Sequence, residues 1–357
     1  MTGSYTYMDL VKKYNNFLVP ALKIKVLGKD VIQANHMVID NVSLSISLNQ
    51  ASVIKFNILN AYDIKKRSFD SNIKKIFVLG TVFSVELGYG SNTTMVFKGY
   101  VETVEYMLQE FPELSITGTD VRRLMMNTVQ QNFPYVVQNY FNVFTMVMEK
   151  YKKICTSLVI DKTQDKLTRI VQNTSDYDFI TKDVCVKSNR EFFVIADKAY
   201  FLEKMKNSTP IITLGIGNGL ISFNRKIKYL QEEIKLIGVD EGKKQNIEAS
   251  IQVKAYRGQK SVLAKAPTTV EVSANINNAK DVNVKLKALK NERLKKAQGG
   301  SGSCIGLPEL VPGRYVKIAK FDKDADDTYF INKIEHSFSL GDGFSTQFEI
   351  AGYKEKK

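Results

Sequence analysis

The feature that most constrains this chain is the alternation of apolar and polar residues in short runs that end at turns. Val42, Leu44, Ile46 and Leu48 alternate with Ser43, Ser45 and Ser47. Successive side chains of a β-strand point to opposite faces, so this pattern predicts a strand with one buried face. Similar short runs lie at 22–26, 53–59, 82–87, 95–104 and 114–117, with no long helix between them. Together they predict a small antiparallel β-barrel over residues 20–120.

Three further β-patterned runs close the chain, at Arg314–Lys320, Thr328–Phe338 and Phe344–Tyr353. The acidic turn Asp322–Asp327 separates the first two, and Gly341–Gly343 separates the second and third. Turn chemistry of this kind, opened by Pro312-Gly313, predicts a three-stranded antiparallel meander. With strands expected at 220–223, 227–239 and 247–256, we predict a second barrel over the last part of the chain.

An interruption at 257–311 is expected to divide this second barrel. It contains a predicted helix at about 280–298, followed by Gly299-Gly300-Ser301-Gly302-Ser303, which is typical of a helix stop and a flexible linker. The apolar stripe of the helix consists of Val282, Leu286, Leu289 and Ala297, with Lys290 encroaching on it. Because such a stripe needs a partner surface, we expect this helix to reach a neighbouring subunit.

The middle of the chain changes from strand to helix patterning. Apolar residues recur at helical spacing over 138–153, and Ser175 or Asp176 can cap a second helix at 177–186. Runs at 191–195 and 199–203 predict a hairpin. The fold class is therefore mainly β (α+β), with two antiparallel β-barrels and an α/β insert between them. The predicted domains are 1–122 (an N-terminal helix or arm at 7–17 and the first barrel), 123–205 (the insert) and 206–357 (the second barrel).

The charge balance is strongly basic, with 51 Lys and Arg against 37 Asp and Glu and a net charge of +14. Such a field favours polyanions or acidic protein partners. The lysines are spread along the chain, however, so a solvated basic surface explains them equally well. No apolar run reaches the roughly 18–20 residues of a membrane span, and the N-terminus has no secretory pattern, so we expect no membrane anchoring.

No set of residues with the spacing of a catalytic, metal or cofactor site is found. Cys155, Cys185 and Cys304 are odd in number and far apart, which favours buried thiols over disulfides or zinc ligands. His36 and His336 have no Cys or His neighbour at ligand spacing, so His336 is interpreted as a structural histidine in a strand. We therefore expect no catalytic residues, no bound metal and no cofactor.

Three shorter patterns are also interpreted as structural. The acidic turn starts like a calcium loop but has Asp327 and Lys333 where that loop needs Gly and Glu. The glycines of 215–219 lack the Lys-Ser/Thr of a phosphate loop and precede a strand pattern. Glu232 and Glu233 are adjacent in a predicted strand, so they point to opposite faces and cannot act as a glycosidase pair.

The ordered set of strand and turn motifs resembles the phage late control protein D family. That family comprises the hub proteins of contractile phage tails and R-type bacteriocins and the N-terminal part of type VI secretion VgrG proteins. The motifs are LGY at 87–89, VFKG at 96–99, GTD at 118–120, SDYDFI at 175–180, LVPGRYVKI at 310–318, YFINKIEHSF at 329–338 and FSTQF at 344–348. The matching positions are Gly88, Tyr89, Gly99, Gly118, Asp120, Phe179, Pro312, Gly313, Tyr329, His336 and Phe348.

The resemblance covers residues from about 20 to 353 in the same order, and it implies a non-enzymatic structural function. The protein would be a baseplate hub that joins a sixfold tail tube to a trimeric spike. The implied partners are two further copies in a homotrimer, the spike protein, a tail-tube or tube-initiator protein and other baseplate proteins. DNA would pass through the central channel in a phage, and the location would be the tail of a phage or tailocin particle. The alternative function is that of a basic nucleic-acid-binding β-barrel protein, while a baseplate glycosidase or peptidase lacks catalytic groups here.

Overall fold

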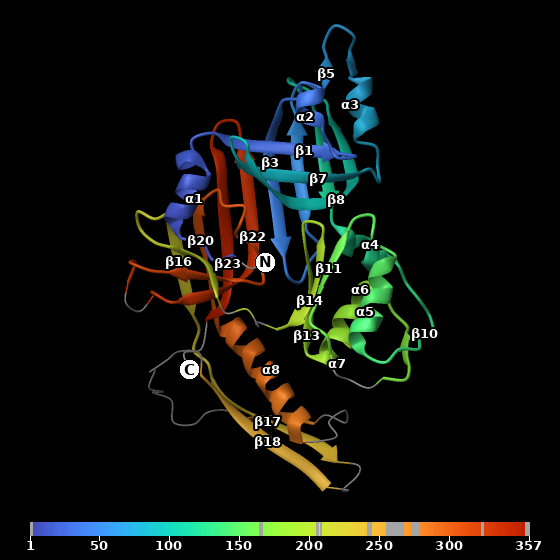
Figure 1. The fold of residues 1–357 in the computed structure, drawn as a ribbon, viewed down its shortest axis with the longest axis vertical. Coiled ribbons are helices and arrows are strands. Elements are labelled where there is room, and N and C mark those ends of the chain that lie inside the picture. Colours follow the sequence, from blue (N-terminus) through green and yellow to red (C-terminus); the bar gives the residue numbers. More distant parts are fainter. Residues whose placement is uncertain are drawn as a thin grey trace.

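The protein is mainly β, and a continuous 13-stranded sheet is its centre (Figure 1). The structure is a computed structural model that describes residues 3–163, 167–204, 207, 209–240, 245–254, 268–272, 279–322 and 325–353. Along the sheet the strand order is β16-β20-β23-β22-β3-β4-β9-β8-β7-β1-β2, with β21 and β15 added beside β22. The mainly β fold class predicted from the alternation is therefore confirmed.

The first half of the chain supplies seven of these strands. They are β1 (Pro20–Val26), β2 (Lys29–Asp30), β3 (Ile39–Ser47), β4 (Val53–Ile58), β7 (Val82–Tyr89), β8 (Asn92–Met107) and β9 (Glu113–Thr119). The alternation in β3 is observed as predicted, since Val42, Leu44 and Ile46 are buried. Strand β8 extends beyond the predicted 95–104 because its polar ends continue to pair with β7 and β9.

Shorter elements flank this half. They are α1 (Tyr7–Lys13), a 3₁₀ turn η1 (Asn15–Phe17), α2 (Val31–Ala34), β5 (Tyr62–Asp63), β6 (Ser68–Phe69) and α3 (Ser71–Ile76). The predicted N-terminal helix begins in a capping box, in which the side chains of Thr6 and Asp9 each accept the other's backbone N–H. Figure 1 shows β5 and α3 at the upper end of the molecule, beyond the sheet.

The last part of the chain supplies β15 (Pro210–Leu214), β16 (Leu220–Ile227), β20 (Gln298–Ile305), β21 (Tyr315–Ile318), β22 (Thr328–Ser339) and β23 (Gly343–Tyr353). The predicted meander of three strands is confirmed as β21-β22-β23. The glycine-rich stretch 299–303 was wrongly predicted as a flexible linker, because it forms most of β20. A Cβ on Gly302 would lie 2.3 Å from the ring of Phe348, so β20 needs glycine to pack beneath that ring.

Strand β22 joins the two halves of the molecule. On one edge it pairs with β23, and on the other it pairs first with β21 and then with β3, from Lys333↔Ser47 to Phe338↔Val42. One hydrophobic core accordingly includes Leu44 and Phe56 of the first half and Ile334 and Phe348 of the second. The hydrogen-bonded strands described here follow an open path and do not close into two separate rings. The two-barrel architecture and the domain boundaries thus stay predictions.

The insert has a core of its own beside the sheet. Its elements are α4 (Val121–Asn127), β10 (Phe133–Tyr135), α5 (Tyr140–Glu149), β11 (Ser157–Ile160), β12 (Ile170–Gln172), α6 (Asp176–Asp178), a π-helical segment η2 (Phe179–Val184), α7 (Cys185–Ser188), β13 (Arg190–Ile195) and β14 (Lys198–Glu203). Both predicted helices and the hairpin are present. Phe144 stacks on Phe201 with ring centroids 4.8 Å apart, which packs α5 on the small sheet.

A third core lies between β17 (Gln231–Asp240), β18 (Gln245–Lys254), β19 (Thr268–Val272) and α8 (Ala279–Ala297). These strands form a separate three-stranded sheet, whereas we expected the strand pair at 227–239 and 247–256 to belong to the second barrel. Val282 and Leu286 of α8 are buried against Ile234 and Leu236 of β17. We expected α8 to reach a neighbouring subunit because its apolar stripe needs a partner surface. That reason was wrong, because strands of the same chain cover the stripe. Residues 257–267 and 273–278 of the predicted interruption lie outside the described residues, as do the last two residues of the strand predicted at 247–256.

Candidate functional site

A buried Asp120–Arg122 ion pair joins the large sheet to the insert. Strand β9 ends at Thr119, and Asp120 caps the next helix, α4, by accepting the N–H of Arg122 at 2.8 Å. The Arg122 side chain is 0% exposed and that of Asp120 is 2% exposed, with 2.7 Å between Nη2 and Oδ2. The pair therefore sits at the point where the sheet ends and the insert begins.

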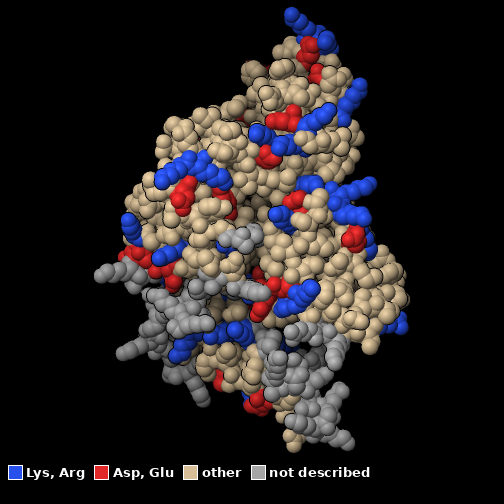
Figure 2. Space-filling view, viewed as in Figure 1, with Lys and Arg blue, Asp and Glu red and all other residues tan. Residues whose placement is uncertain are grey.

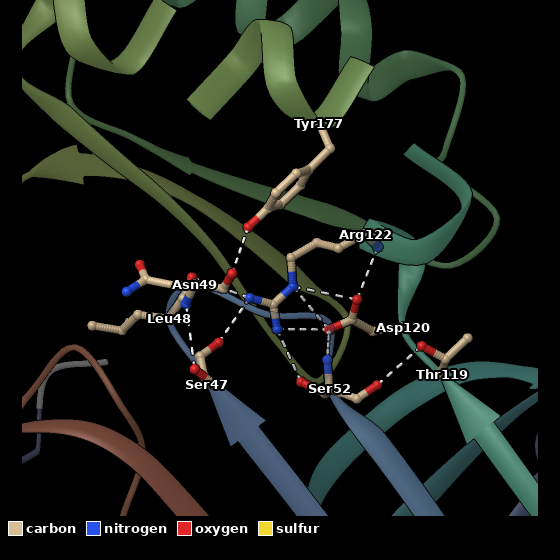
Figure 3. A network of polar contacts seen from close by, with 8 residues as sticks. All are labelled: Ser47, Leu48, Asn49, Ser52, Thr119, Asp120, Arg122 and Tyr177. Atoms are coloured by element: carbon tan, nitrogen blue, oxygen red, sulfur yellow. Dashed lines mark hydrogen bonds and ion pairs between the residues drawn. The ribbon is translucent and has the colours of Figure 1, made fainter. Parts of the chain in front are cut away.

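Every donor of the Arg122 guanidinium has an acceptor in this junction (Figure 3). Nε donates to Asp120, Nη1 donates to the carbonyls of Ser47 and Leu48 at 2.7 and 3.2 Å, and Nη2 donates to Asp120 and to Ser52 Oγ at 3.0 Å. A guanidinium carries five N–H donors in a fixed planar arrangement, and here all five are used. The arginine thus fixes the β3–β4 turn against the start of α4.

The Asp120 carboxylate completes the network from the other side. It accepts the backbone N–H of Ser52 at 2.8 Å, while the Asp120 N–H donates to the carbonyl of Ser52 at 3.1 Å. Removing one member of a buried pair leaves an unpaired charge, which costs about 3–5 kcal/mol. This arrangement holds backbone segments of the sheet and the insert together.

A second polar network ties the insert helices together and reaches the same turn. The fully buried Asp176 carboxylate accepts hydrogen bonds from Tyr151 at 2.6 Å, Gln172 at 2.7 Å and Lys150 at 3.0 Å. Burial, with a smaller effect of the hydrogen bond to Asp176, raises the pKa of Tyr151. The neighbouring Tyr177 donates its hydroxyl to the carbonyl of Asn49 at 2.9 Å, so helix α6 also contacts the β3–β4 turn.

The N-terminal arm is tied to the closing strands by a less buried contact. Glu309 accepts hydrogen bonds from Tyr14 at 2.6 Å and from Lys13 at 2.7 Å. Burial, followed by the charge of Glu309, raises the pKa of Tyr14 to about 12. Tyr89 packs against both Tyr14 and Phe344 and donates its hydroxyl to the carbonyl of Gly306 at 3.0 Å. Residues from both ends of the chain meet here.

The residues singled out from the sequence are distributed over the fold and form no single site. Two of the glycines mark close backbone approaches, because a Cβ on Gly88 or Gly99 would lie 2.1 Å from a carbonyl oxygen of the adjacent strand. Phe179 stacks on Tyr135 with ring centroids 5.5 Å apart, inside the insert core. Of the positions singled out from the sequence, Asp120 alone belongs to the network around Arg122. The family role of these positions stays a prediction.

The remaining positions lie in the closing strands or beside them. Gly313 has a φ of 80°, where L side chains are strained, and it follows Pro312 in the turn before β21. Tyr329 is buried and donates its hydroxyl to the carbonyl of Ala325 at 2.6 Å, which closes the acidic turn. Phe348 covers Gly302, as described above. These contacts give each of these positions a structural function.

His336 is a buried histidine of β22 and not part of a ligand cluster. Its Nδ1 lies 2.9 Å from Thr346 Oγ1, whereas its Nε2 has no hydrogen-bond partner among the described residues. Burial lowers the pKa of His336 to about 3, so the ring is neutral at ordinary pH. The three cysteines are buried thiols, and the described part of the chain contains no cluster of three or more His, Cys, Asp or Glu side chains fit to hold a metal ion.

The acidic turn uses one of its carboxylates internally. Asp326 accepts the backbone N–H groups of Lys320, Phe321 and Asp322 at 2.8–3.2 Å. These bonds hold the pKa of Asp326 below its usual value. Asp326 therefore shapes the hairpin, although residues 323 and 324 of the turn lie outside the described residues.

Among the helices that the structure describes, none combines the length and apolar character needed to cross a bilayer.

Sequence reasoning missed Arg122, which is the centre of the junction. Arginine is rarely buried, so an arginine after a strand is expected to lie on the surface. The only signal was its place two residues after Asp120, because an aspartate at a strand-to-helix junction caps the helix and can hold an arginine of the first turn. Nothing in the sequence indicated that the β3–β4 turn would supply the other acceptors.

Comparison with known proteins identifies the fold. A tail protein from Neisseria meningitidis is 13% identical with a TM-score of 0.69, covering 93% of this chain and 96% of that one. The 43 kDa tail protein of prophage MuSo2 from Shewanella oneidensis is 11% identical with a TM-score of 0.70, covering 93% and 98%. A component of the type VI secretion system of E. coli is 11% identical with a TM-score of 0.56, covering 93% and 77%. At these identities the likeness shows the fold alone.

The likeness extends over nearly the whole length of both tail proteins, so the expected resemblance to tail proteins is confirmed at the level of the fold. No curated protein sequence matches the chain. A family model described as the Alg8 N-terminal domain matches residues 18–339, and this description names a domain without an activity. The chain therefore belongs to the Alg8 N-terminal domain family, and its fold is that of phage tail proteins.

Proposed function

We propose that this protein is the structural hub of a contractile tail baseplate, which joins a sixfold tail tube to a trimeric spike. The observation that carries the proposal is the fold likeness to two tail proteins over 96% and 98% of their lengths. The contacts of the Arg122 junction and of Tyr177 hold backbone segments in place. A structural function in a phage tail or a related injection particle accounts for both observations.

The buried connections support this function physically. The β22–β3 pairing makes one sheet of the two halves, and the Arg122 junction attaches the insert to that sheet. Close-packed interiors of this kind resist deformation and transmit strain. A hub must keep hold of the spike while the contracting sheath drives the tube forward, so a sheet and an insert that are joined by buried contacts suit it.

The proposed assembly is a homotrimer with a central channel. Each chain contributes two similar β-rich halves, 20–120 and 206–353, which we propose act as two barrel-like modules on either side of the insert 123–205. Three chains then present six modules to a sixfold tube and keep threefold symmetry for the spike. Cyclic closure is the ordinary way in which identical chains satisfy complementary surfaces.

The proposed partners are the spike protein, a tail-tube or tube-initiator protein and other baseplate proteins. In a phage, DNA would pass through the channel, and the net charge of +14 suits a polyanion or acidic partner surfaces. Any DNA binding should then depend steeply on salt and little on base sequence. Tight binding to one sequence at high salt would favour the nucleic-acid-binding alternative instead.

The decisive experiment is electron microscopy and light scattering of the purified protein with its spike and tube proteins. We expect a mass of three chains and a threefold ring with the spike on one face. A strict monomer in the presence of the spike, or a hexamer of equivalent chains, would contradict the proposal. Peptidoglycan hydrolysis by the purified protein, or stoichiometric zinc in metal analysis, would contradict the non-enzymatic, metal-free function.

A further inference from the structure

The glycine-rich turn between β15 and β16 contains a chemically labile pair of residues. Asn218 is followed by Gly219, and no other asparagine of the chain precedes a glycine. The turn is tight, since the N–H of Asn218 donates to the carbonyl of Gly215 at 2.8 Å, and residues 216–219 are partly or fully exposed. An Asn-Gly pair places a side-chain amide next to a backbone nitrogen that no Cβ covers.

Neither of the two groups that can react is held by a hydrogen bond. Among the described residues, the Asn218 side chain has no hydrogen-bond partner, and the backbone N–H of Gly219 has none either. Gly219 has a φ of 78°, which glycine adopts without strain. The turn also faces open space, because a Cβ on Gly217 would meet nothing within 4 Å. The Asn218 side chain can therefore move until its Cγ meets the nitrogen of Gly219.

A second turn asparagine of the same chain shows the opposite arrangement. Asn92 lies at the start of β8, and its side-chain amide donates to the carbonyl of Lys13 at 2.7 Å. The residue after it is Thr93, whose branched Cβ crowds its own backbone nitrogen. Asn92 is thus both engaged and hindered, whereas Asn218 is neither. The two residues form an internal comparison within one molecule.

We propose that Asn218 is a site of spontaneous deamidation, with water as the only co-reactant, and that its iso-aspartyl product loosens the N-terminal arm. The nitrogen of Gly219 attacks Cγ of Asn218, so that an N–Cγ bond forms and the Cγ–Nδ2 bond breaks. Ammonia leaves with the proton of the Gly219 N–H. Water then opens the cyclic imide: addition at Cγ gives aspartate, and addition at the main-chain carbonyl carbon gives iso-aspartate. The proposal does not depend on the hub function.

The arm is affected because Gly219 packs against it. The carbonyl of Gly219 accepts the N–H of Ile305 at 3.1 Å, and a Cβ on Gly219 would lie 2.7 Å from the ring of Tyr7 in α1. Tyr7 in turn stacks on Phe17 with ring centroids 6.0 Å apart. In iso-aspartate the main chain runs through the side chain, which adds one carbon directly before Gly219. Close-packed groups cannot absorb such an addition without moving, so the contact with Tyr7 should weaken.

The first test is peptide mapping by mass spectrometry after the full-length protein is incubated in mildly alkaline buffer. Asn218 should convert about tenfold faster than Asn92 or more, which corresponds to about 1.4 kcal/mol in barrier height. Conversion lowers the net charge of +14 by one. Lys and Arg side chains are spread over the face drawn in Figure 2, so the native chain should bind a cation exchanger and the converted chain should elute earlier. An Asn218 that stays intact in the folded chain, whether or not it converts in urea, would overturn the proposal.

The second test is hydrogen exchange of the α1 amides in three samples. They are the incubated native chain, the incubated Asn218→Gln variant, whose longer side chain closes the ring less readily, and the fresh Asn218→Asp variant, which has the new charge without the extra main-chain carbon. We expect faster exchange in the incubated native chain alone. Equal exchange in all three samples would contradict the effect on the arm. An equal rise in Asn218→Asp would show that the charge, and not the longer main chain, loosens the arm, which would also contradict the proposal.

Discussion

Two polar contacts tie distant segments of this protein together, and they differ in how far water reaches them. The Asp120–Arg122 pair is buried away from water, with side chains 2% and 0% exposed. In the contact of the N-terminal arm, the Glu309 side chain is 7% exposed but that of Lys13 is 38% exposed. Water can replace a lost partner at the second contact and not at the first. Two ion pairs of similar chemistry therefore differ in strength: the buried Asp120–Arg122 pair holds its segments firmly, whereas the partly exposed Lys13–Glu309 pair holds the arm weakly.

The largest expected effect comes from breaking the buried Asp120–Arg122 pair. Arg122→Ala should lower the free energy of unfolding by about 3–5 kcal/mol, because Asp120 and the carbonyls of Ser47 and Leu48 lose their buried partner. Urea denaturation followed by circular dichroism measures this. The control is Arg123→Ala, which removes an arginine that is 45% exposed and paired with Glu102. If both variants lost the same free energy of unfolding, burial would not explain how much each ion pair contributes to stability.

A second prediction concerns His336, a buried histidine whose Nε2 has no hydrogen-bond partner among the described residues. The pKa of His336 is about 3 in the folded chain and close to 6.5 in the unfolded chain, so between these values only the unfolded chain binds the proton. Stability should therefore fall as the pH is lowered through this window. Between pH 7 and pH 4.5 the loss from this residue is about 3 kcal/mol.

The comparison for His336 is the pH dependence of the same denaturation in His336→Leu, which cannot titrate at this position. Carboxylates and the overall charge contribute equally to both proteins, so the difference between the two curves isolates the histidine. His336→Gln serves if the leucine variant does not fold. Parallel curves from pH 7 to pH 4.5 would show that the pKa of His336 is the same in the folded and the unfolded chain, which would contradict the prediction.

A smaller effect is expected where the insert touches the β3–β4 turn. Tyr177→Phe removes one hydrogen bond to the carbonyl of Asn49 and keeps the ring, so unfolding should become easier by about 1 kcal/mol. Hydrogen exchange of the α6 amides should rise at the same time. Tyr229→Phe, on an exposed tyrosine outside the insert, is the control. If Tyr177→Phe lowered the free energy of unfolding as much as Arg122→Ala, the hydrogen bond of Tyr177 would be as important as the ion pair for holding the insert on the sheet.

The smallest effect is expected at the arm. Lys13→Ala should cost less than about 1 kcal/mol, because the lysine is partly exposed and Tyr14 still donates to Glu309. The urea midpoint should move little, and Lys12→Ala provides the reference. A loss of several kcal/mol would show that the arm is as firmly fixed as the insert.

The sequence predicted the strands of β3, β21, β22 and β23 well, because alternation reports directly which face is buried. It could not predict that β22 pairs with β3, since alternation gives the face of a strand and not its neighbour. The glycines of β20 were predicted to be a linker because the ring of Phe348, which requires glycine at position 302, comes about 45 residues later in the chain. The Arg122 junction was missed for a similar reason, as its acceptors come from a turn more than 70 residues away.

The pairing of β3 with β22 sets an order of events during synthesis. Ser43 of β3 donates to Glu335 of β22 across 292 residues of sequence. At roughly 5–20 residues per second, the ribosome needs on the order of 15–60 s to deliver that partner strand. Throughout this interval one edge of the early sheet has no native neighbour, and unpaired edges recruit strands from other molecules. The last strands of the chain thus determine when a newly made molecule stops being at risk of aggregation.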